Sequence, residues 1–286
     1  MLIDEYRDQL PINRMCELSG VSRTAFYAWT SSKHVDVKDL QSMALLEQIN
    51  EMVLEFSGYG YRRVTAELKR RGYCINHKKV LRMMRKANLT IKKKRSRFHT
   101  TDSNHCFFIY PNLAKHLISS TINQLWVADI TYIRLYYEFA YLAAILDAFS
   151  RKVVGWSLKR SLDHELTLSA LRMALYRRDI TPGLIHHSDR GVQYACMEYT
   201  DLLKKHGILI SMASTGNPYE NAQAESFIAT LKREEVYLSQ YDNISEALLR
   251  IGHFIEDVYN AKRLHSSLGY LPPEEFERNL VTVNWS

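Results

Sequence analysis

The sequence predicts an α/β domain preceded by a basic, all-α region. Three consecutive strand-length runs rich in Val, Ile, Tyr and Trp predict an antiparallel meander: QLWVADITYIRL, EFAYLAAILDAF and RKVVGWSLKR. Helical and strand patterns then alternate as far as about residue 234. Upstream of about residue 100, the pattern is helical and the charge is concentrated and positive.

A chain of 286 residues with 46% hydrophobic content is long enough for two or three domains with real cores. It contains no apolar run of about 18 residues, and its first ten residues, MLIDEYRDQL, carry acids where a signal peptide is basic. We therefore expect a cytoplasmic protein with no membrane segment. The four cysteines are scattered without a CxxC pair, which favours reduced thiols over disulfides.

The net charge of +7 is unevenly distributed. Of the 38 lysines and arginines, fifteen lie between Gly58 and Thr100, where Glu67 is the one acid. Such a segment beside an acidic remainder predicts a nucleic-acid-binding arm. The alternative is a basic face that is merely solvated.

The residues from about Ile12 to Trp29 predict a first helix-turn-helix, with its turn at Ser19-Gly20 and Ser22 as the N-cap of the second helix. Arg23, Thr24 and Tyr27 would then face a major groove. Its core is expected to contain Met15, Leu18, Val21 and Phe26. A helical hairpin that only contacts other proteins is the alternative.

A helix is expected over residues 40–56, and a second, more basic helix-turn-helix follows it. We expect a helix over 64–71 that stops at Gly72, and another that begins at Asn76 and runs through Ala87. One face of the latter packs, and the other carries only positive charge. The basic tether IKKKRSRFH continues from it. The candidate DNA contacts in this region are Arg62, Arg63, Lys78, Lys79, Arg82, Arg85, Lys92, Lys93, Lys94 and Arg95.

After a linker over about 104–120, the predicted order is three strands, helix, strand, helix, strand, helix. This order matches a ribonuclease-H-like mixed sheet of five strands flanked by helices, in which the first strand is central. The domains are then expected at 1–39, 40–103, 121–240 and, for a helical extension, 241–286.

Three acids stand where this arrangement could bring them together. Asp129 lies on the first strand, Asp189 follows a later strand, and Glu225 lies on a helix at or near its buried face. Acids held close together repel one another unless divalent cations neutralise them. Oxygen ligands without thiols suit two Mg²⁺ or Mn²⁺ ions acting in phosphoryl transfer. The alternative is three scattered surface acids.

Four neighbouring polar residues have other expected roles. Asp147 is expected to cap a turn rather than bind metal. His186 is expected to pack in the core, and His187 to make a hydrogen bond that supports the acidic site. Asn221 has two open roles, contact with DNA and simple capping of the helix.

Several motifs together resemble a known family. WVADITYI, LDAFSRKVVGW, HSDRGVQY and NAQAESFIATLKREE resemble the core of transposases of insertion-sequence family 3, the second-reading-frame product, which is similar to the retroviral integrase core. GYGYRRVTAELKRRG resembles the helix-turn-helix that precedes that core. The resemblance implies that Asp129, Asp189 and Glu225 bind metal for cutting transposon ends and joining their 3′ hydroxyls to target DNA. It also implies that Lys232 contacts the terminal DNA.

The expected function is therefore a DNA transposase that acts on double-stranded terminal repeats and target DNA in a bacterial, nucleoid-associated setting. We expect it to form a homo-oligomer on DNA and to have the element's upstream reading-frame product as a possible partner. Two alternatives stay open: a ribonuclease-H-like nuclease or resolvase that cuts without joining, and a DNA-binding regulator of transposition.

Overall fold

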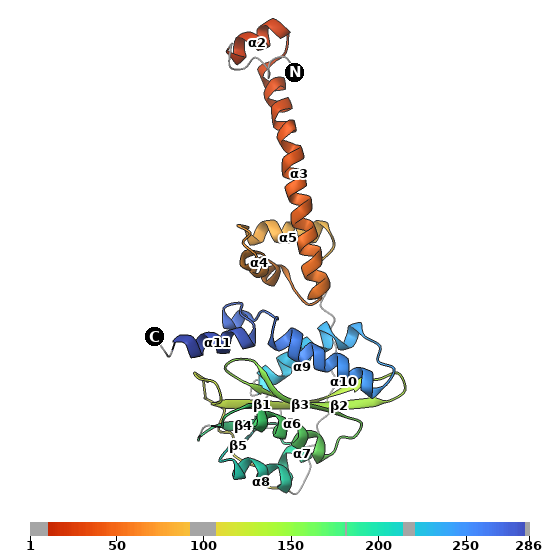
Figure 1. The fold of residues 1–286 in the computed structure, drawn as a ribbon, viewed down its shortest axis with the longest axis vertical. Coiled ribbons are helices and arrows are strands. Elements are labelled where there is room, and N and C mark those ends of the chain that lie inside the picture. The colour runs from red at the N-terminus through yellow and green to blue at the C-terminus, as the bar shows by residue number, and fades with distance from the viewer. Residues whose placement is uncertain (1–10, 92–106, 181, 214–220, 284–286) are drawn as a thin grey trace.

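The computed structural model describes residues 11–91, 107–180, 182–213 and 221–283, with the backbone alone for 31–40 and 281–283. Figure 1 shows a helical region at the amino end and an α/β domain below it. Residues 107–124 join the two regions without forming a helix or strand.

A single helix of 33 residues, α3 (Arg23–Glu55), runs through the helical region. Figure 1 shows α2 (Ile12–Ser19) at its far end and α4 (Tyr61–Arg70) and α5 (His77–Lys86) beside its near end. The predicted start of a new helix at residue 40 is wrong, because this stretch contains neither glycine nor proline to interrupt it. Within the described residues, no helix is both long enough and apolar enough to cross a membrane.

The first helix-turn-helix forms as predicted at its turn. Gly20 adopts a left-handed conformation with φ of 66°, and the Ser22 hydroxyl accepts a hydrogen bond from Ala25 N at 3.1 Å. Leu18 does not join the core, since it is 68% exposed, and Cys16 takes a buried place instead. The buried residues of this small core are Met15, Cys16 and Phe26.

The second helix-turn-helix has its predicted turn and cap, although α4 begins at Tyr61 and not at the predicted residue 64. Gly72 follows α4 with a φ of 88°, and Asn76 Oδ1 caps α5 by accepting from Lys78 N at 2.8 Å. Its core includes one residue from the far end of the chain, Leu264. The buried members are Leu45, Ile49, Met52, Phe56, Tyr59, Val64, Leu68, Val80, Met84 and Leu264.

The α/β domain is built on a mixed sheet of five strands in the order β3-β2-β1-β4-β5. Its strands are β1 (Leu125–Arg134), β2 (Phe139–Asp147), β3 (Val153–Lys159), β4 (Ile185–Ser188) and β5 (Leu209–Met212). The first three pair antiparallel, whereas β4 and β5 run parallel to β1. The predicted meander and the central position of β1 are confirmed.

Helices cover both faces of this sheet (Figure 1). One face packs against α6 (His164–Arg177), α7 (Val192–Ala195) and α8 (Met197–Lys205). The other packs against α9 (Ala222–Glu234), α10 (Ile244–His253) and the π-helix η3 (Phe254–Asn260). Short 3-10 helices at Val236–Leu238 (η2) and Ser266–Leu268 (η4) and the helix α11 (Pro273–Val283) complete the chain.

The alternation of side chains along β1 decides which layer meets the first candidate acid. Trp126 and Ala128 join the core on the α6 side, and Val127 joins the core on the α9 side. Because successive strand side chains point to opposite faces, Asp129 lies on the same side as Val127 and therefore on that of α9.

Candidate active site

Asp129 and Asp189 lie side by side through strand register. The parallel pairing of β1 with β4 ends at Val127 opposite His187, and each aspartate stands two residues beyond that pair. Neighbouring strands lie about 4.8 Å apart. Asp189 follows the carboxyl end of β4, and Asp129 lies beside it within β1, which continues to Arg134. The two carboxylates therefore meet where the parallel pairing of the two strands ends.

Backbone N–H groups hold both aspartates. Asp129 Oδ1 accepts a hydrogen bond from Ile130 N at 2.8 Å, and Asp189 Oδ1 accepts one from Gly191 N at 2.9 Å. A Cβ on Gly191 would lie 3.0 Å from the same Asp189 oxygen. The glycine in the Asp-Arg-Gly turn therefore leaves room for the carboxylate.

The helix α9 brings the third candidate acid to the same face of the sheet. Ala224, Phe227 and Leu231 anchor it in the core at 1% exposure or less. Glu225 itself is exposed, so the prediction that it lies at or near the buried face is wrong. Its position beside the buried Ala224 places it on the flank of the helix. Lys232 is half-buried, with Nζ 4.3 Å from the centre of the Tyr132 ring.

The three acids affect one another electrostatically. Burial and the charges of Asp189 and Glu225 together raise the pKa of Asp129 to about 7, although the Ile130 N–H and Lys232 oppose the rise. Burial also raises the pKa of the Glu225 carboxyl. The cluster is therefore short of positive charge as it stands.

Asn221 ties the start of α9 to β1. Its Nδ2 donates to Ala128 O at 3.1 Å, and Ala128 immediately precedes Asp129. Although Asn221 occupies the N-cap position, its side chain makes no capping hydrogen bond, so the simple capping role is wrong. Its buried Oδ1 accepts no hydrogen bond from the residues that the structure describes.

The two histidines of β4 support the strands. His186 is buried against Tyr199, whose hydroxyl lies 2.9 Å from His186 Nε2, and burial lowers the pKa of His186 to about 3. His187 Nδ1 lies 2.8 Å from Ser211 Oγ, which accepts from Leu113 N. The packing expected for His186 is thus observed, and His187 makes a hydrogen bond to a serine of β5.

Asp147 fills the structural role expected of it. Its fully buried carboxylate accepts hydrogen bonds from three backbone N–H groups, those of Asn123 at 2.6 Å, Phe149 at 2.9 Å and Ser150 at 3.0 Å. These bonds hold the turn after β2 against the start of β1. The carboxylate is fully occupied by the backbone.

One tyrosine beside the acids was not predicted from the sequence. Tyr194 is 2% exposed, and among the described residues its hydroxyl has no hydrogen-bond partner. Burial raises the pKa of this hydroxyl, and the nearby Asp189 and Asp129 raise it further. The signal was its position in the motif HSDRGVQY, five residues after Asp189.

No closed metal cage is formed by the parts of the chain that the structure describes. Within them, no three His, Cys, Asp or Glu side chains are gathered closely enough to hold a metal ion. Residues 214–220, which precede α9, lie outside the described residues.

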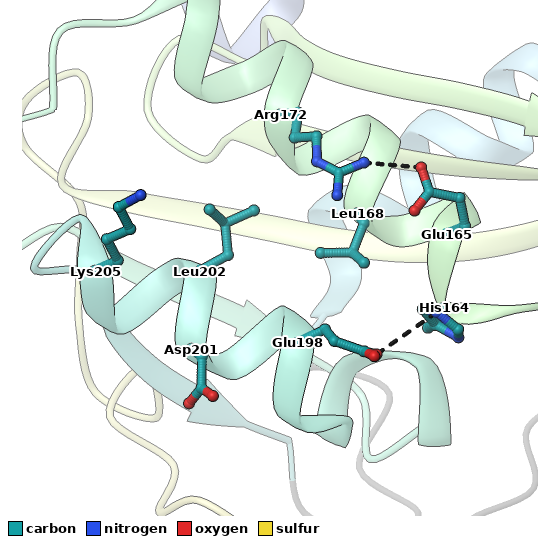
Figure 2. A pocket seen from close by; sticks show the side chains of 8 residues that line it. All are labelled: His164, Glu165, Leu168, Arg172, Glu198, Asp201, Leu202 and Lys205. Atoms are coloured by element: carbon teal, nitrogen blue, oxygen red, sulfur yellow. Dashed lines mark hydrogen bonds and ion pairs between the residues drawn. The ribbon is translucent and has the colours of Figure 1, made fainter.

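A separate surface pocket of about 440 Å³ lies between α6 and α8 (Figure 2). Its ion pairs are His164 with Glu198 at 3.6 Å and Arg172 with Glu165 at 2.8 Å. None of the three candidate acids lines it, so this pocket is distinct from the acidic site.

The predicted DNA contacts on the helical region differ in where they lie. Arg62 and the α5 residues Lys78, Lys79, Arg82 and Arg85 are exposed. Arg63 is half-buried instead, and its Nε donates to Leu264 O at 2.9 Å. The four tether residues lie outside the described residues: Lys92, Lys93, Lys94 and Arg95.

A mixed sheet with two aspartates on neighbouring parallel strands, preceded in the chain by a helix-turn-helix region, is the arrangement of an integrase-type core. Two family models described as integrase core domains match residues 120–218 and 206–273, and a model described as an HTH-like domain matches residues 41–97. These matches confirm the predicted fold class.

The chain belongs to the IS3 family of transposases. It is 37% identical to the insertion element IS600 uncharacterized 31 kDa protein of Shigella sonnei, over 92% of this chain and 97% of that protein. It is 33% identical to the transposase InsF for insertion sequence IS3A of Escherichia coli K12, over 98% and 99%. The catalytic core domain of BIV integrase aligns at 18% identity and a TM-score of 0.44, over 57% of this chain and 99% of that one.

Proposed function

We propose that this transposase binds the ends of its insertion sequence, cleaves them and joins the 3′ ends to target DNA. The observation that carries the proposal is the meeting of Asp129 and Asp189 at the end of a parallel strand pair, beneath the helix that bears Glu225 and Lys232. A surface cluster of acids in an arbitrary arrangement would not share this geometry.

Asp129, Asp189 and Glu225 are the residues that would hold Mg²⁺ or Mn²⁺. Two observations support their fit: the pKa of Asp129 is raised by burial and by its acidic neighbours, and the buried Asn221 Oδ1 lacks a hydrogen bond among the described residues. Two such ions, when bound, would stabilise the attacking and leaving oxygens of an in-line phosphoryl transfer. Because the three acids do not form a closed cage as they stand, Glu225 would be drawn toward the aspartates.

The protein's own side chains position the DNA and balance its charge. Lys232 binds a phosphate of the terminal strand, held in place by its contact with the Tyr132 ring. Asn221 holds the start of α9 against the carbonyl before Asp129, which fixes how far Glu225 stands from the strands. No side chain is required to form a covalent bond to DNA.

Sequence-specific binding is assigned to α4 and α5. Arg62, Lys78, Lys79, Arg82 and Arg85 are exposed and free to meet phosphates or base edges. The basic tether from Lys92 to Arg95 would extend this contact. A homo-oligomer on DNA, the upstream reading-frame product as partner and a nucleoid-associated location belong to the same proposal.

Purified protein incubated with labelled element ends, target DNA and Mg²⁺ tests the proposal. We expect cleaved ends first and then products in which a 3′ end is joined to target DNA. Cleaved ends without joined products would instead indicate a nuclease or resolvase, and binding without either product would indicate a regulator.

Metal binding has a readout that does not depend on activity. Binding to the folded state alone raises the free energy of unfolding by about 2.7 kcal/mol when the ion is present at 100 times its dissociation constant. We expect Mn²⁺ to raise the Tm of the wild type but not that of Asp129→Asn or Asp189→Asn. Asp201→Asn, an exposed exchange on α8, should keep the full shift. Equal shifts in all four proteins would remove the aspartates from the metal site.

A further inference from the structure

A buried ion pair outside the acidic site joins α9 to the carboxyl-terminal part of the chain. Arg263 donates to both carboxylate oxygens of Glu234, from Nε at 2.7 Å and from Nη2 at 2.8 Å. Arg263 is 1% exposed and Glu234 is 9% exposed. Burial alone would raise the pKa of Glu234, but the hydrogen bonds and charges of Arg263 and of the neighbouring Arg233 outweigh it and lower that pKa. The pair is therefore ionised.

The residue after Arg263 belongs to the core of the second helix-turn-helix. Leu264 packs its side chain among the residues of α3, α4 and α5. Its backbone N donates to Tyr59 Oη at 2.7 Å, and its carbonyl accepts from Arg63 Nε at 2.9 Å. One short segment thus contacts α9 through a side chain and the helical region through its backbone and the next side chain.

The helical region also touches α9 directly. A Cβ on Gly58 would lie 2.0 Å from Glu234 Oε1, so the backbone before α4 is pressed against this carboxylate. Ser57 Oγ donates to Glu234 O at 3.4 Å. The turn that precedes α4 and the end of α9 therefore form a close contact that only glycine permits at position 58.

A second bridge runs through α11. Glu275 accepts two hydrogen bonds from Arg70 of α4, at 3.1 and 2.7 Å. On the same helix, Glu274 pairs with Lys152 at 3.0 Å, and Glu277 pairs with Arg178, both from the α/β domain. These pairs are more exposed and so contribute less than the buried one.

The covalent connection does not explain a fixed arrangement of the two regions. The described part of it, residues 107–124, contains neither helix nor strand. Figure 1 shows α4 and α5 on the side of the sheet that α9 and α10 cover. The contacts at Glu234, together with those of Leu264 and of α11, hold that pair of helices against the sheet.

We propose that the Glu234–Arg263 pair is a positioning device that locks α9 to the second helix-turn-helix, so that the phosphate that is cut is set by the sequence that is bound. The inference rests on the proposed function. Glu234 ends the same helix that carries Glu225 and Lys232, and it lies two residues beyond the lysine. A rotation of α9 against α4 and α5 would therefore move both residues relative to the bound DNA.

Two variants test this inference. The double exchange Glu234→Gln with Arg263→Met removes both charges while keeping similar volumes, so that neither charge is left buried without its partner. Tyr59→Phe removes only the hydroxyl that receives the Leu264 N–H and keeps the stacking of this ring on Phe56. Arg172→Met, which breaks an exposed pair on the opposite face of the sheet, is the matched control.

Two measurements are made on each protein. Calorimetry, which needs no DNA, should show one unfolding transition for the wild type and Arg172→Met, and two for the double exchange. Mapping of cut positions should show one phosphate for the wild type and several adjacent phosphates for the double exchange, with cutting at the correct phosphate reduced by about a hundredfold. Affinity for the end should change less than about twofold, and Tyr59→Phe should show the same spread of cut positions to a smaller degree.

A single transition with one unchanged cut position in both variants would overturn the inference. A loss of cutting at all positions in equal proportion, with one transition kept, would also overturn it, because that pattern indicates a general loss of activity. If the wild type neither binds nor cuts the ends, the proposed function fails, while the number of unfolding transitions still decides whether the pair locks the two regions.

Discussion

Replacement of Lys78, Arg82 and Arg85 by glutamine should weaken end binding and flatten its dependence on salt. All three side chains are exposed on α5, whereas Val80 and Met84 on its other face are fully buried. The exchange therefore removes three charges without disturbing the core, and the free energy of unfolding should change by less than about 0.5 kcal/mol per site.

The magnitude follows from the release of counterions. Each phosphate contact contributes about 0.9 to the slope of log K against log salt on duplex DNA, so three lost contacts reduce the slope by about 2.7. When the salt concentration rises about fourfold, from 50 to 200 mM, both proteins should lose affinity for the end. The loss should be about 40 times smaller for the α5 variant than for the wild type.

Fluorescence anisotropy with a labelled terminal repeat over this salt range measures both quantities. The control variant carries three glutamines at exposed basic positions on the far face of the sheet: Arg172, Lys204 and Lys205. The assignment of α5 to DNA binding would be refuted if the α5 variant had the same salt slope as the wild type. It would also be refuted if the control variant's slope fell as much as that of the α5 variant.

Three further outcomes are expected. Glu225→Gln should bind ends within about twofold of the wild type but lose cleavage and joining by at least about a thousandfold, about 4 kcal/mol, in the Mg²⁺ assay; retained joining would exclude Glu225. Gly155→Ala should lower the free energy of unfolding, measured by urea denaturation, by about 1–3 kcal/mol, since its Cβ would lie 2.2 Å from the backbone of α6. Gly60→Ala should leave that free energy nearly unchanged, because Gly60 has open space around it and a φ of −82°. His186 and His265, whose pKa values burial lowers to about 3, stay neutral in the folded state but take up protons in the unfolded state below about pH 6.5. Lowering the pH from 6.5 to 5 should therefore lower the free energy of unfolding by about 3 kcal/mol in total; a flat unfolding free energy over that range would contradict this.

Local sequence signals were enough for most of the fold. Alternation and β-branched residues located β1 to β3, and Asn76, Gly72 and Ser22 marked helix ends because capping and left-handed turns depend on a few adjacent residues. The position of Asp129 beside Asp189 was also expected, because the predicted fold places their two strands side by side.

What the sequence could not predict depends on contacts between distant segments. In the sequence, Arg63 is one of several neighbouring basic residues. Its contact with Leu264 joins two residues that are 201 positions apart, so no local pattern predicts it. The exposure of Glu225 depends on how far α9 is rotated about its own axis. The pattern of apolar residues in the sequence predicts that rotation only to within about one residue position. The long α3 was missed for a different reason, since polar residues over 31–39 resemble a loop but contain nothing that breaks a helix.

The length of α3 sets the distance between the two helix-turn-helix units. At about 1.5 Å per residue, its 33 residues span about 50 Å. That distance equals about fifteen base pairs of straight duplex, at about 3.4 Å per step. The first helix-turn-helix packs around Phe26, and the second packs against α3 between Leu45 and Phe56. Their centres are therefore separated by about 24 residues of α3, about 36 Å, which is about one turn of DNA. Two units one turn apart would meet the same side of a duplex, so an insertion or deletion of half a turn between their sites would weaken binding more than one of a full turn.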